Sequence, residues 1–270
     1  MGLRRFLVSV VRKMNFDLII DVGPAVMAAC VLLSLFAGFI KGTVGFALPM
    51  ILISGLATFL PAEVALAGMI IPSVVANTYQ AFRNGALAAH QSVKDHRVYL
   101  GVLLVVLVLS AQLVTLLPSW SLFLIVGVPI SLMATLQLVG WRPKVDPSRR
   151  RTVEVGAGFV SGFLGGMTGA WGTATVFYLT ALSTPKIEQM RVQGVVFAAG
   201  SFMFFFAHLT SGILTAPSLT LSAVLLVPVL IGLGIGYRLN ARLDQEKFRT
   251  ITLIVLILAG LNLIRRGLLG

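Results

Sequence analysis

The sequence predicts an all-α integral membrane protein with two homologous halves, each containing about four spanning helices and one short re-entrant segment. Hydrophobic residues make up 57% of the chain and charged residues 11%, and the mean hydropathy is +0.98. A water-soluble domain of this length cannot expose so apolar a surface. Apolar segments of about 18 residues or more recur along the sequence, which indicates spanning helices, because a transmembrane barrel would show short alternating strands.

A glycine-rich stretch occurs twice in the sequence, at an offset of 124 positions. Gly38-Phe39-Ile40-Lys41-Gly42-Thr43-Val44-Gly45 corresponds to Gly162-Phe163-Leu164-Gly165-Gly166-Met167-Thr168-Gly169, and Pro61 corresponds to Pro185. An internal repeat with a glycine-rich break near the start of each copy is typical of duplicated transport domains. We therefore interpret the chain as a duplicated membrane domain.

The order along the chain is a basic N-terminal segment, then two repeats joined by a basic linker. The predicted boundaries are 1–16 for the basic amphipathic segment, 17–141 for the first repeat, 142–152 for the cytoplasmic linker and 153–270 for the second repeat. Arg4, Arg5, Arg12 and Lys13 lie among apolar residues in the first segment, a spacing that suits a helix lying on a membrane surface.

Each repeat is predicted to contain several long apolar segments and one unusually short segment. The segments cover 18–40, 46–60, 62–82, 98–117 and 121–140 in the first repeat, and 153–168, 171–183, 189–209, 219–237 and 250–264 in the second. At 1.5 Å per residue the segment 46–60 is about 22 Å long, less than the ~30 Å hydrocarbon core. We therefore predict that 46–60 and 171–183 re-enter the membrane instead of crossing it.

The distribution of Lys and Arg leaves two topologies open. In the first, which we favour, each half spans four times and the N-terminus, the loops 83–97 and 142–151, and Arg265-Arg266 are all cytoplasmic. The basic loop around Arg238 and Lys247 does not fit this topology, because it would then lie outside. In the second, each half has an odd number of crossings and the halves are inverted, which repairs that loop but places the basic N-terminal segment outside.

Composition and motifs exclude several classes of function. The net charge of +12 comes from clusters between apolar segments, where lipid headgroups explain it better than nucleic acid. The single Cys30 and three scattered histidines give no disulfide and no metal-ligand spacing, so no cofactor or metal is expected. No nucleophile motif or intramembrane cluster of acids is present, so we do not expect an enzyme.

The two glycine-rich breaks are the predicted substrate site. A helix that restarts within the membrane has free N–H groups, which favour an anion, and Gly42, Gly45, Gly166 and Gly169 would let two such starts meet near the midplane. The alternative is that these glycines simply let helices pack closely. The short apolar segment after each break favours the site.

A few polar residues within the apolar segments are candidates for substrate contact. Arg191 is the predicted charge partner of the anion, although it could also extend to the membrane interface. Asn77 could contact the substrate or mark a helix end. Thr43 and Thr168 could bond substrate oxygens or their own helix backbone, Lys41 could attract an anion or mark the interface, and His208 is a candidate proton carrier or an interfacial histidine.

The doubled pattern resembles the TauE/SafE sulfite exporter family, or TSUP permeases. The resemblance rests on the first glycine-rich stretch, which continues through Phe46-Ala47-Leu48-Pro49, on its second copy, and on Gln80-Ala81-Phe82-Arg83. It implies a bacterial inner-membrane permease with about eight spans that moves sulfite, sulfonates or similar small anions, linked to the proton gradient. Trp171-Gly172-Thr173 replaces the proline expected after the second break, and Trp171 could form an apolar wall of the site or simply pack between helices.

The resulting hypothesis is a proton-linked secondary transporter for a small anion, most plausibly sulfite, a sulfonate or a related organosulfur anion. The predicted substrate-binding residues are Gly42, Thr43, Gly45, Asn77, Gly166, Thr168, Gly169, Trp171 and Arg191. The expected partners are the anion and membrane lipids, with no nucleic acid, and the oligomeric state is left open. Both termini are expected to be cytoplasmic. The alternative function is a membrane scaffold or assembly factor without transport.

Overall fold

The computed structural model describes residues 23–269 except for 84, 142–144, 170 and 240–244, and these residues form helices with no strand among them. In the first half the helices are α3 (Pro24–Val44), α4 (Leu48–Leu56), α5 (Ala62–Phe82), α6 (Ala86–Asp95), α7 (Arg97–Ala111), the short η1 (Val114–Leu116) and α8 (Ser119–Leu138). In the second half they are η2 (Pro147–Arg149), α9 (Arg150–Thr168), α10 (Trp171–Ala181), α11 (Lys186–Thr210), α12 (Ala216–Leu239) and α13 (Gln245–Leu269). The predicted surface helix at 1–16 and part of the predicted linker lie outside the described residues.

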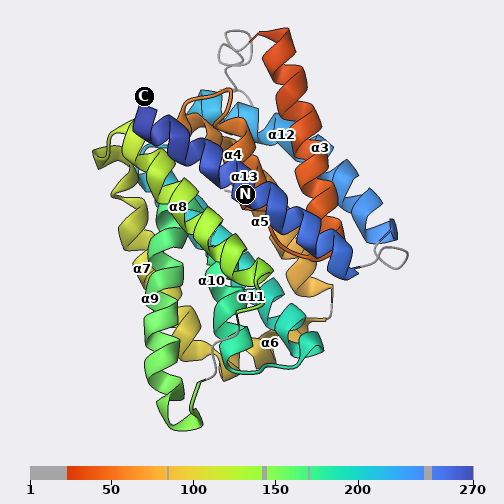
Figure 1. Cartoon of the computed structure of the whole chain (residues 1–270), viewed down its shortest axis with the longest axis vertical. Coiled ribbons are helices and arrows are strands. Elements are labelled where there is room, and N and C mark those ends of the chain that lie inside the picture. The colour runs from red at the N-terminus through yellow and green to blue at the C-terminus, as the bar shows by residue number, and fades with distance from the viewer. Residues whose placement is uncertain (1–22, 84, 142–144, 170, 240–244, 270) are drawn as a thin grey trace, which may run out of the picture.

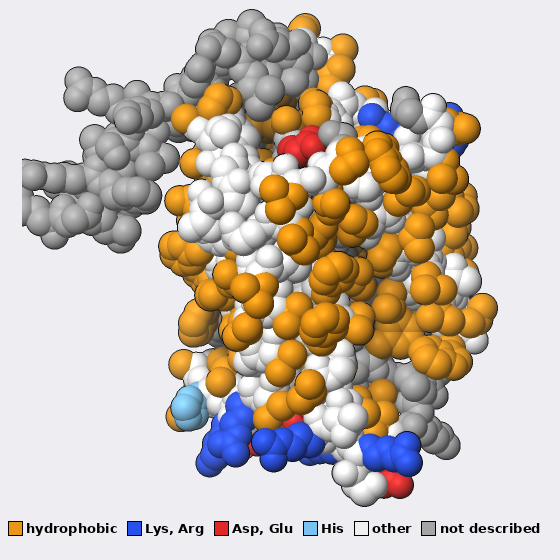
Figure 2. Space-filling model, turned by 90° about the vertical axis from the view of Figure 1, so that its left-hand side faces the viewer, with side chains coloured by type: hydrophobic (Ala, Val, Ile, Leu, Met, Phe, Trp, Pro, Cys, Tyr) orange, Lys and Arg blue, Asp and Glu red, His pale blue; other side chains and the backbone are white. Residues whose placement is uncertain are grey.

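The long apolar helices confirm the predicted fold class, an all-α integral membrane protein. Among the described residues, α3, α5, α7 together with η1, α8, α11 and α12 are each long and apolar enough to cross a membrane. Figure 2 shows hydrophobic side chains covering the middle of one face, with Lys and Arg gathered at its lower end. This is the surface that a lipid bilayer with aqueous boundaries requires.

Helices from the two halves are interleaved. α3 packs most extensively on α12 and α9 on α7, while α8 pairs with α13 and α5 with α11. The long diagonal helices α8 and α13 are visible in Figure 1. Each of these four pairs contains one helix from each side of the linker, so neither half folds as a separate lobe. The pairing is symmetric between the two halves. If each helix is replaced by its counterpart in the other half, α3 by α9, α5 by α11, α7 by α12, α8 by α13 and the reverse, the same four pairs result.

Glycines explain why two of these pairs pack so closely. A Cβ added at Gly42 would meet the backbone of Leu233 and Gly236 in α12, and a Cβ at Gly166 would meet the backbone of Leu107 and Ala111 in α7. Small residues that allow such backbone approach are typical of helix pairs in membranes. The close-packing alternative therefore describes Gly42 and Gly166 well.

The pairs of residues that define the repeat have matching backbone conformations. Gly45 and Gly169 both end a helix in the left-handed region, with φ of 87° and 71°. Pro61 and Pro185 both precede a long helix, with φ of −55° and −57°. The duplication, which the sequence predicts from residue identity, is thus accompanied by the same local structure at both breaks.

In the first half, the helix before the break (α3) and the helix after the short α4 (α5) begin at the same end of the molecule. α3 runs parallel to α12, since Gly38 faces Val229 and Gly42 faces Leu233, and α5 also starts beside the start of α12, where Ser222 bonds Gly68. α4 therefore carries the chain back to the end at which α3 began. At the opposite end, which we call the α6 end, Arg150 of α9 donates to the backbone oxygen of Asp95 in α6.

The positions of the described part of the linker and of the last turn of α13 fit the inverted alternative better than the topology that we favoured. The linker lies at the α6 end, where Val145 bonds Ala181 at the end of α10. The last turn of α13 lies at the other end, because Gly267 packs against Trp120 at the start of α8. The favoured topology assumes that the chain leaves α4 on the side where α3 ends. With α4 returning the chain, each half has an odd number of passes and the C-terminal arginines lie opposite the linker.

The α6 end also contains a helix that hydropathy did not predict. α6 is short and polar, with exposed Leu87, and was expected to be loop. Arg83, Lys94 and Arg97 lie in or beside it, and the starts of α9 and α11 and the end of α12 add further cations there. This end is the lower one in Figures 1 and 2.

Candidate functional site

Two helix starts face one another inside the molecule. α3 ends at Gly45, Ala47 adopts a left-handed φ of 76°, and α4 starts at Leu48. The second break is similar, with Gly169 in the left-handed region and α10 starting at Trp171. Because the first N–H groups of a helix have no partner within it, each start presents partial positive charge.

These two starts line one small cavity. Its lining comprises Lys41, Phe46, Ala47, Pro49, Met50, Asn77, Gly169, Trp171, Gly172 and Phe197. The cavity is about 20 Å³, enough for a water molecule but not for a larger ligand. The structure therefore represents a closed state, in which any larger ligand needs its walls to move apart.

Lys41 is the charged group of this cavity. Its side chain is 1% exposed, and its ammonium Nζ donates to Asn77 Oδ1 at 2.6 Å and to Gln80 Oε1 at 2.5 Å. A third, longer bond of 3.3 Å runs to the backbone oxygen of Gly45 at the break. The Nζ also lies 5.2 Å from the centre of the Phe197 ring, which places a cation over an aromatic face.

No carboxylate balances the charge of Lys41 among the described residues. α3, α4, α10 and α12 contain no Asp or Glu, and the acids of α5 and α11, Glu63 and Glu188, lie in the first turns of their helices. The only ion pair found in the described part of the chain joins Arg150 to Glu154. All three acceptors of Lys41 are neutral oxygens, so the cavity has a net positive charge when Lys41 is protonated.

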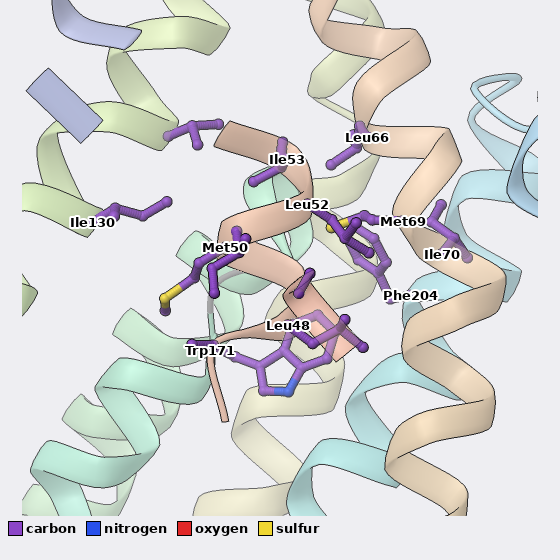
Figure 3. Close-up of a cluster of buried hydrophobic side chains, with 14 of the residues drawn as sticks. Leu48, Met50, Leu52, Ile53, Leu66, Met69, Ile70, Ile130, Trp171 and Phe204 are labelled. Atoms are coloured by element: carbon purple, nitrogen blue, oxygen red, sulfur yellow. The ribbon is translucent and has the colours of Figure 1, made fainter. Parts of the chain in front are cut away.

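Aromatic and apolar side chains form the remaining walls. Trp171 is 1% exposed, packs against Gly165 and Gly200, and lies with its ring centre 5.4 Å from that of Phe204. Figure 3 shows Trp171 below Leu48 at the start of α4, with Met50 on the same helix. Trp171 thus fills the space between the two helix starts.

The structure brings four of the predicted site residues together. Asn77, Gly169 and Trp171 line the cavity, and Gly45 contributes the backbone oxygen that accepts from Lys41. The assignment of Trp171 as an apolar wall therefore agrees with its position. Whether these residues bind substrate stays a prediction.

The other five predicted residues do not line the cavity. Gly42 and Gly166 lie at helix contacts, as described above. Thr43 donates to the backbone of its own helix at Ile40, and Thr168 donates to Leu164. Those bonds are the helix-backbone alternative considered for both threonines.

Arg191, the predicted charge partner, lies near the α6 end of α11. Its Nε is buried without a hydrogen-bond partner in the described part of the structure. Three residues further along the helix, Gly194 packs against the backbone of Gln80 and Ala81. Arg191 is therefore near the helix end that holds Gln80, but outside the lining of the cavity.

His208, the candidate proton carrier, is buried in a different place. Its Nε2 lies 3.1 Å from the backbone oxygen of Gly166, and its Nδ1 lies 3.2 Å from Ser211 Oγ. Both ring nitrogens thus have local partners, as in the interfacial-histidine alternative.

Sequence reasoning gave Lys41 too little weight and missed Gln80, Phe46 and Phe197. The available signal was the position of Lys41, a cation directly after an apolar run in which the nearest preceding acid, Asp21, is 20 positions away. Such a residue is expensive in a membrane unless it has a function. The partners Asn77 and Gln80 follow 36 and 39 residues later, a separation at which pairing cannot be inferred from sequence.

The fold and the cavity define a multi-pass membrane protein with an internal cationic cavity between two broken helices. The chain belongs to the TauE/SafE sulfite exporter family, since the family model described as "Sulfite exporter TauE/SafE" matches residues 30–263. The match includes both breaks and every residue that lines the cavity. It confirms the resemblance seen in the sequence and places the chain in a transporter family. Searches of curated proteins and of solved structures gave no significant match.

Proposed function

We propose that the protein is a secondary transporter that binds a small anion in the cavity beside Lys41. The observation that carries this proposal is a fully buried ammonium group with only neutral acceptors, placed between two helix N-termini. Lysine and helix starts both favour anions, and both point into one cavity. Membership of a sulfite exporter family supports the same conclusion.

The charge of the cavity favours a monoanion over a dianion. Lys41 supplies one full positive charge, and each helix start adds roughly half an elementary charge before screening. A doubly charged ion would have to lose its hydration in a site with no second charged side chain, which is costly. The proposed substrate is therefore a singly charged sulfur oxoanion, either bisulfite or a small sulfonate whose organic part contacts Trp171 and Phe197.

In this proposal, binding of the anion changes the hydrogen bonds at the break after α3. The three N–H groups of the Lys41 ammonium are all used, and the 3.3 Å bond to Gly45 is the longest of the three. An anion that accepts a hydrogen bond from Nζ replaces Gly45 most easily. The exchange would loosen the turn at 45–47 and let α4 move relative to α10, as alternating access requires.

The proposed location is the bacterial inner membrane, with the α6 end in the cytoplasm. The described cations are concentrated at that end, as the positive-inside rule expects of cytoplasmic loops (Figure 2). The end of α13 would then lie on the outer side, contrary to the initial expectation for the C-terminus. Direct contact with lipids is expected along the apolar faces of α7, α8, α12 and α13.

Calorimetric titration of the detergent-purified protein with methanesulfonate and sulfate tests the proposal. The two ions have similar size, but the first is a monoanion with a methyl group and the second a dianion. We expect methanesulfonate to bind at least about tenfold more tightly, and its flux into proteoliposomes to saturate. Absence of binding by bisulfite, methanesulfonate and other small anions would favour the scaffold alternative.

A further inference from the structure

A second buried polar cluster lies at the α6 end and is not part of the cavity. His96, between α6 and α7, is 3% exposed, and its Nδ1 lies 2.7 Å from the hydroxyl of Tyr178 in α10. The Tyr178 hydroxyl is also 3.4 Å from Glu154 Oε1 in α9, and Glu154 is paired with Arg150 at 2.9 Å. Four titratable side chains from three parts of the fold thus form one connected group.

α10 connects this cluster to the cavity. Trp171, Thr175 and Tyr178 lie at positions i, i+4 and i+7 of α10, so they share one face of the helix. Tyr99 stacks on Tyr178 with ring centres 4.0 Å apart, and its hydroxyl lies 2.8 Å from that of Thr175. Thr175 in turn donates to the backbone oxygen of Trp171. The face that carries the Tyr178 hydroxyl at one end therefore carries a wall of the cavity at the other.

The protonation of His96 decides where the Tyr178 hydrogen points. Neutral His96 can accept that hydrogen at Nδ1, and the short distance between the two groups fits this arrangement. Protonated His96 donates from Nδ1, because an imidazolium has no free acceptor. The Tyr178 hydrogen must then turn to Glu154, where the present distance is longer by 0.7 Å (3.4 Å against 2.7 Å). The two protonation states thus favour different positions of Tyr178 and of α10.

The charges that face His96 come from every neighbouring element. Burial lowers the pKa of His96 most, and Arg150 of α9 lowers it further, while Glu154, Glu188 of α11 and Asp95 of α6 raise it. The net direction is below the usual 6.5, so His96 is neutral near pH 7 and takes up its proton as the pH falls.

We propose that His96 is a proton-binding site, and that its protonation, read out by Tyr178 and transmitted along α10 to Trp171, strengthens anion binding in the cavity. The inference deepens the proposed transport function and rests on it. Its geometric basis is the connected group His96, Tyr178 and Glu154 together with the shared face of α10. The sign follows from charge, since protonation adds a positive group on the α10 side of a site for anions.

The test is the pH dependence of methanesulfonate affinity, because this ion keeps a single charge between pH 5 and pH 8. We expect the dissociation constant of the full-length protein to fall by about fivefold from pH 7.5 to pH 5.0, the lower end of typical coupling between sites. In His96→Gln, which keeps polar groups but does not titrate at this position, the change should be smaller than in the wild-type protein. Tyr178→Phe keeps the stacked ring, removes the hydroxyl, and should reduce the change in the same way.

His90→Gln is the matched control, because His90 is exposed on α6 only six positions before His96. It should keep the fivefold change. Persistence of the full pH dependence in both His96→Gln and Tyr178→Phe would overturn the inference while leaving the anion site intact. If the wild-type protein binds no small anion at any pH, the proposed function fails first, so the two failures are distinguishable.

Discussion

Replacement of Lys41 by Met is the sharpest test of the anion site. Methionine keeps the unbranched chain as far as the ε position and removes the ammonium group with its charge and its donors. An anion oxygen about 4 Å from a positive charge gains about 4 kcal/mol at an effective dielectric constant of about 20. Since part of this gain offsets the loss of hydration, we expect Lys41→Met to weaken methanesulfonate binding by about 100-fold or more, equivalent to about 2.7 kcal/mol.

Calorimetry on the purified variant measures this loss, and flux into proteoliposomes measures its consequence. Lys94→Met is the control, because Lys94 is exposed on α6 and changes the net charge equally. Thermal unfolding should show Lys41→Met at least as stable as the wild type without anion, since the substitution removes a buried charge that has no counter-charge. A folded Lys41→Met protein that binds methanesulfonate within threefold of the wild type would refute the assignment of the site.

Three further predictions follow from packing. Gly158→Ala should lower stability by about 1–3 kcal/mol, because its Cβ would meet the backbone oxygen of Tyr99 at 2.8 Å. Gly156→Ala in the same helix meets nothing within 4 Å and should raise stability by about 0.5–1 kcal/mol. Thermal unfolding in detergent compares the two variants. Trp171→Ala should lower stability by about 3–5 kcal/mol and enlarge the cavity, so that the affinity for benzenesulfonate rises relative to that for methanesulfonate in competition titrations. Arg191→Ala should leave the methanesulfonate dissociation constant within about threefold of the wild type, because Arg191 does not line the cavity; a loss similar to that of Lys41→Met would restore Arg191 as the charge partner.

Most of the fold could be predicted because hydropathy and proline placement are local signals. The segment expected at 62–82 is observed as Ala62–Phe82, between Pro61 and the polar residues after it. α6 was missed because its composition is polar and its helical face is set by packing at the membrane surface. Topology could not be settled for a different reason. It depends on whether the short α4 returns the chain, and the length of a segment does not determine its direction.

The site was predicted only in part, because its contacts join distant segments. The sequence identifies the breaks, which are local features of glycine and proline, and the structure places Gly45 and Gly169 at both helix ends. From the sequence we ranked Arg191 above Lys41 as the charge partner of the anion, but Lys41 is the one that lines the cavity. Both residues lie in apolar surroundings in the sequence, so the sequence does not distinguish them. Only the side-chain hydrogen bonds of the folded structure show that Lys41 of α3 meets Asn77 and Gln80 of α5.

The environment of Lys41 is better suited to an anion than to the lysine itself. A lysine that served the fold alone would be expected to have a carboxylate partner, because burial of an unpaired ammonium costs several kcal/mol. Here Asn77, Gln80 and Gly45 satisfy its N–H groups with neutral oxygens, while the starts of α4 and α10 add positive potential to the same cavity. The acceptor oxygens and the Phe197 ring stabilise the ammonium group, but the two helix starts make the lysine less favourable and an anion more favourable. In the proposed function, a bound anion supplies the negative charge that the described residues around Lys41 lack.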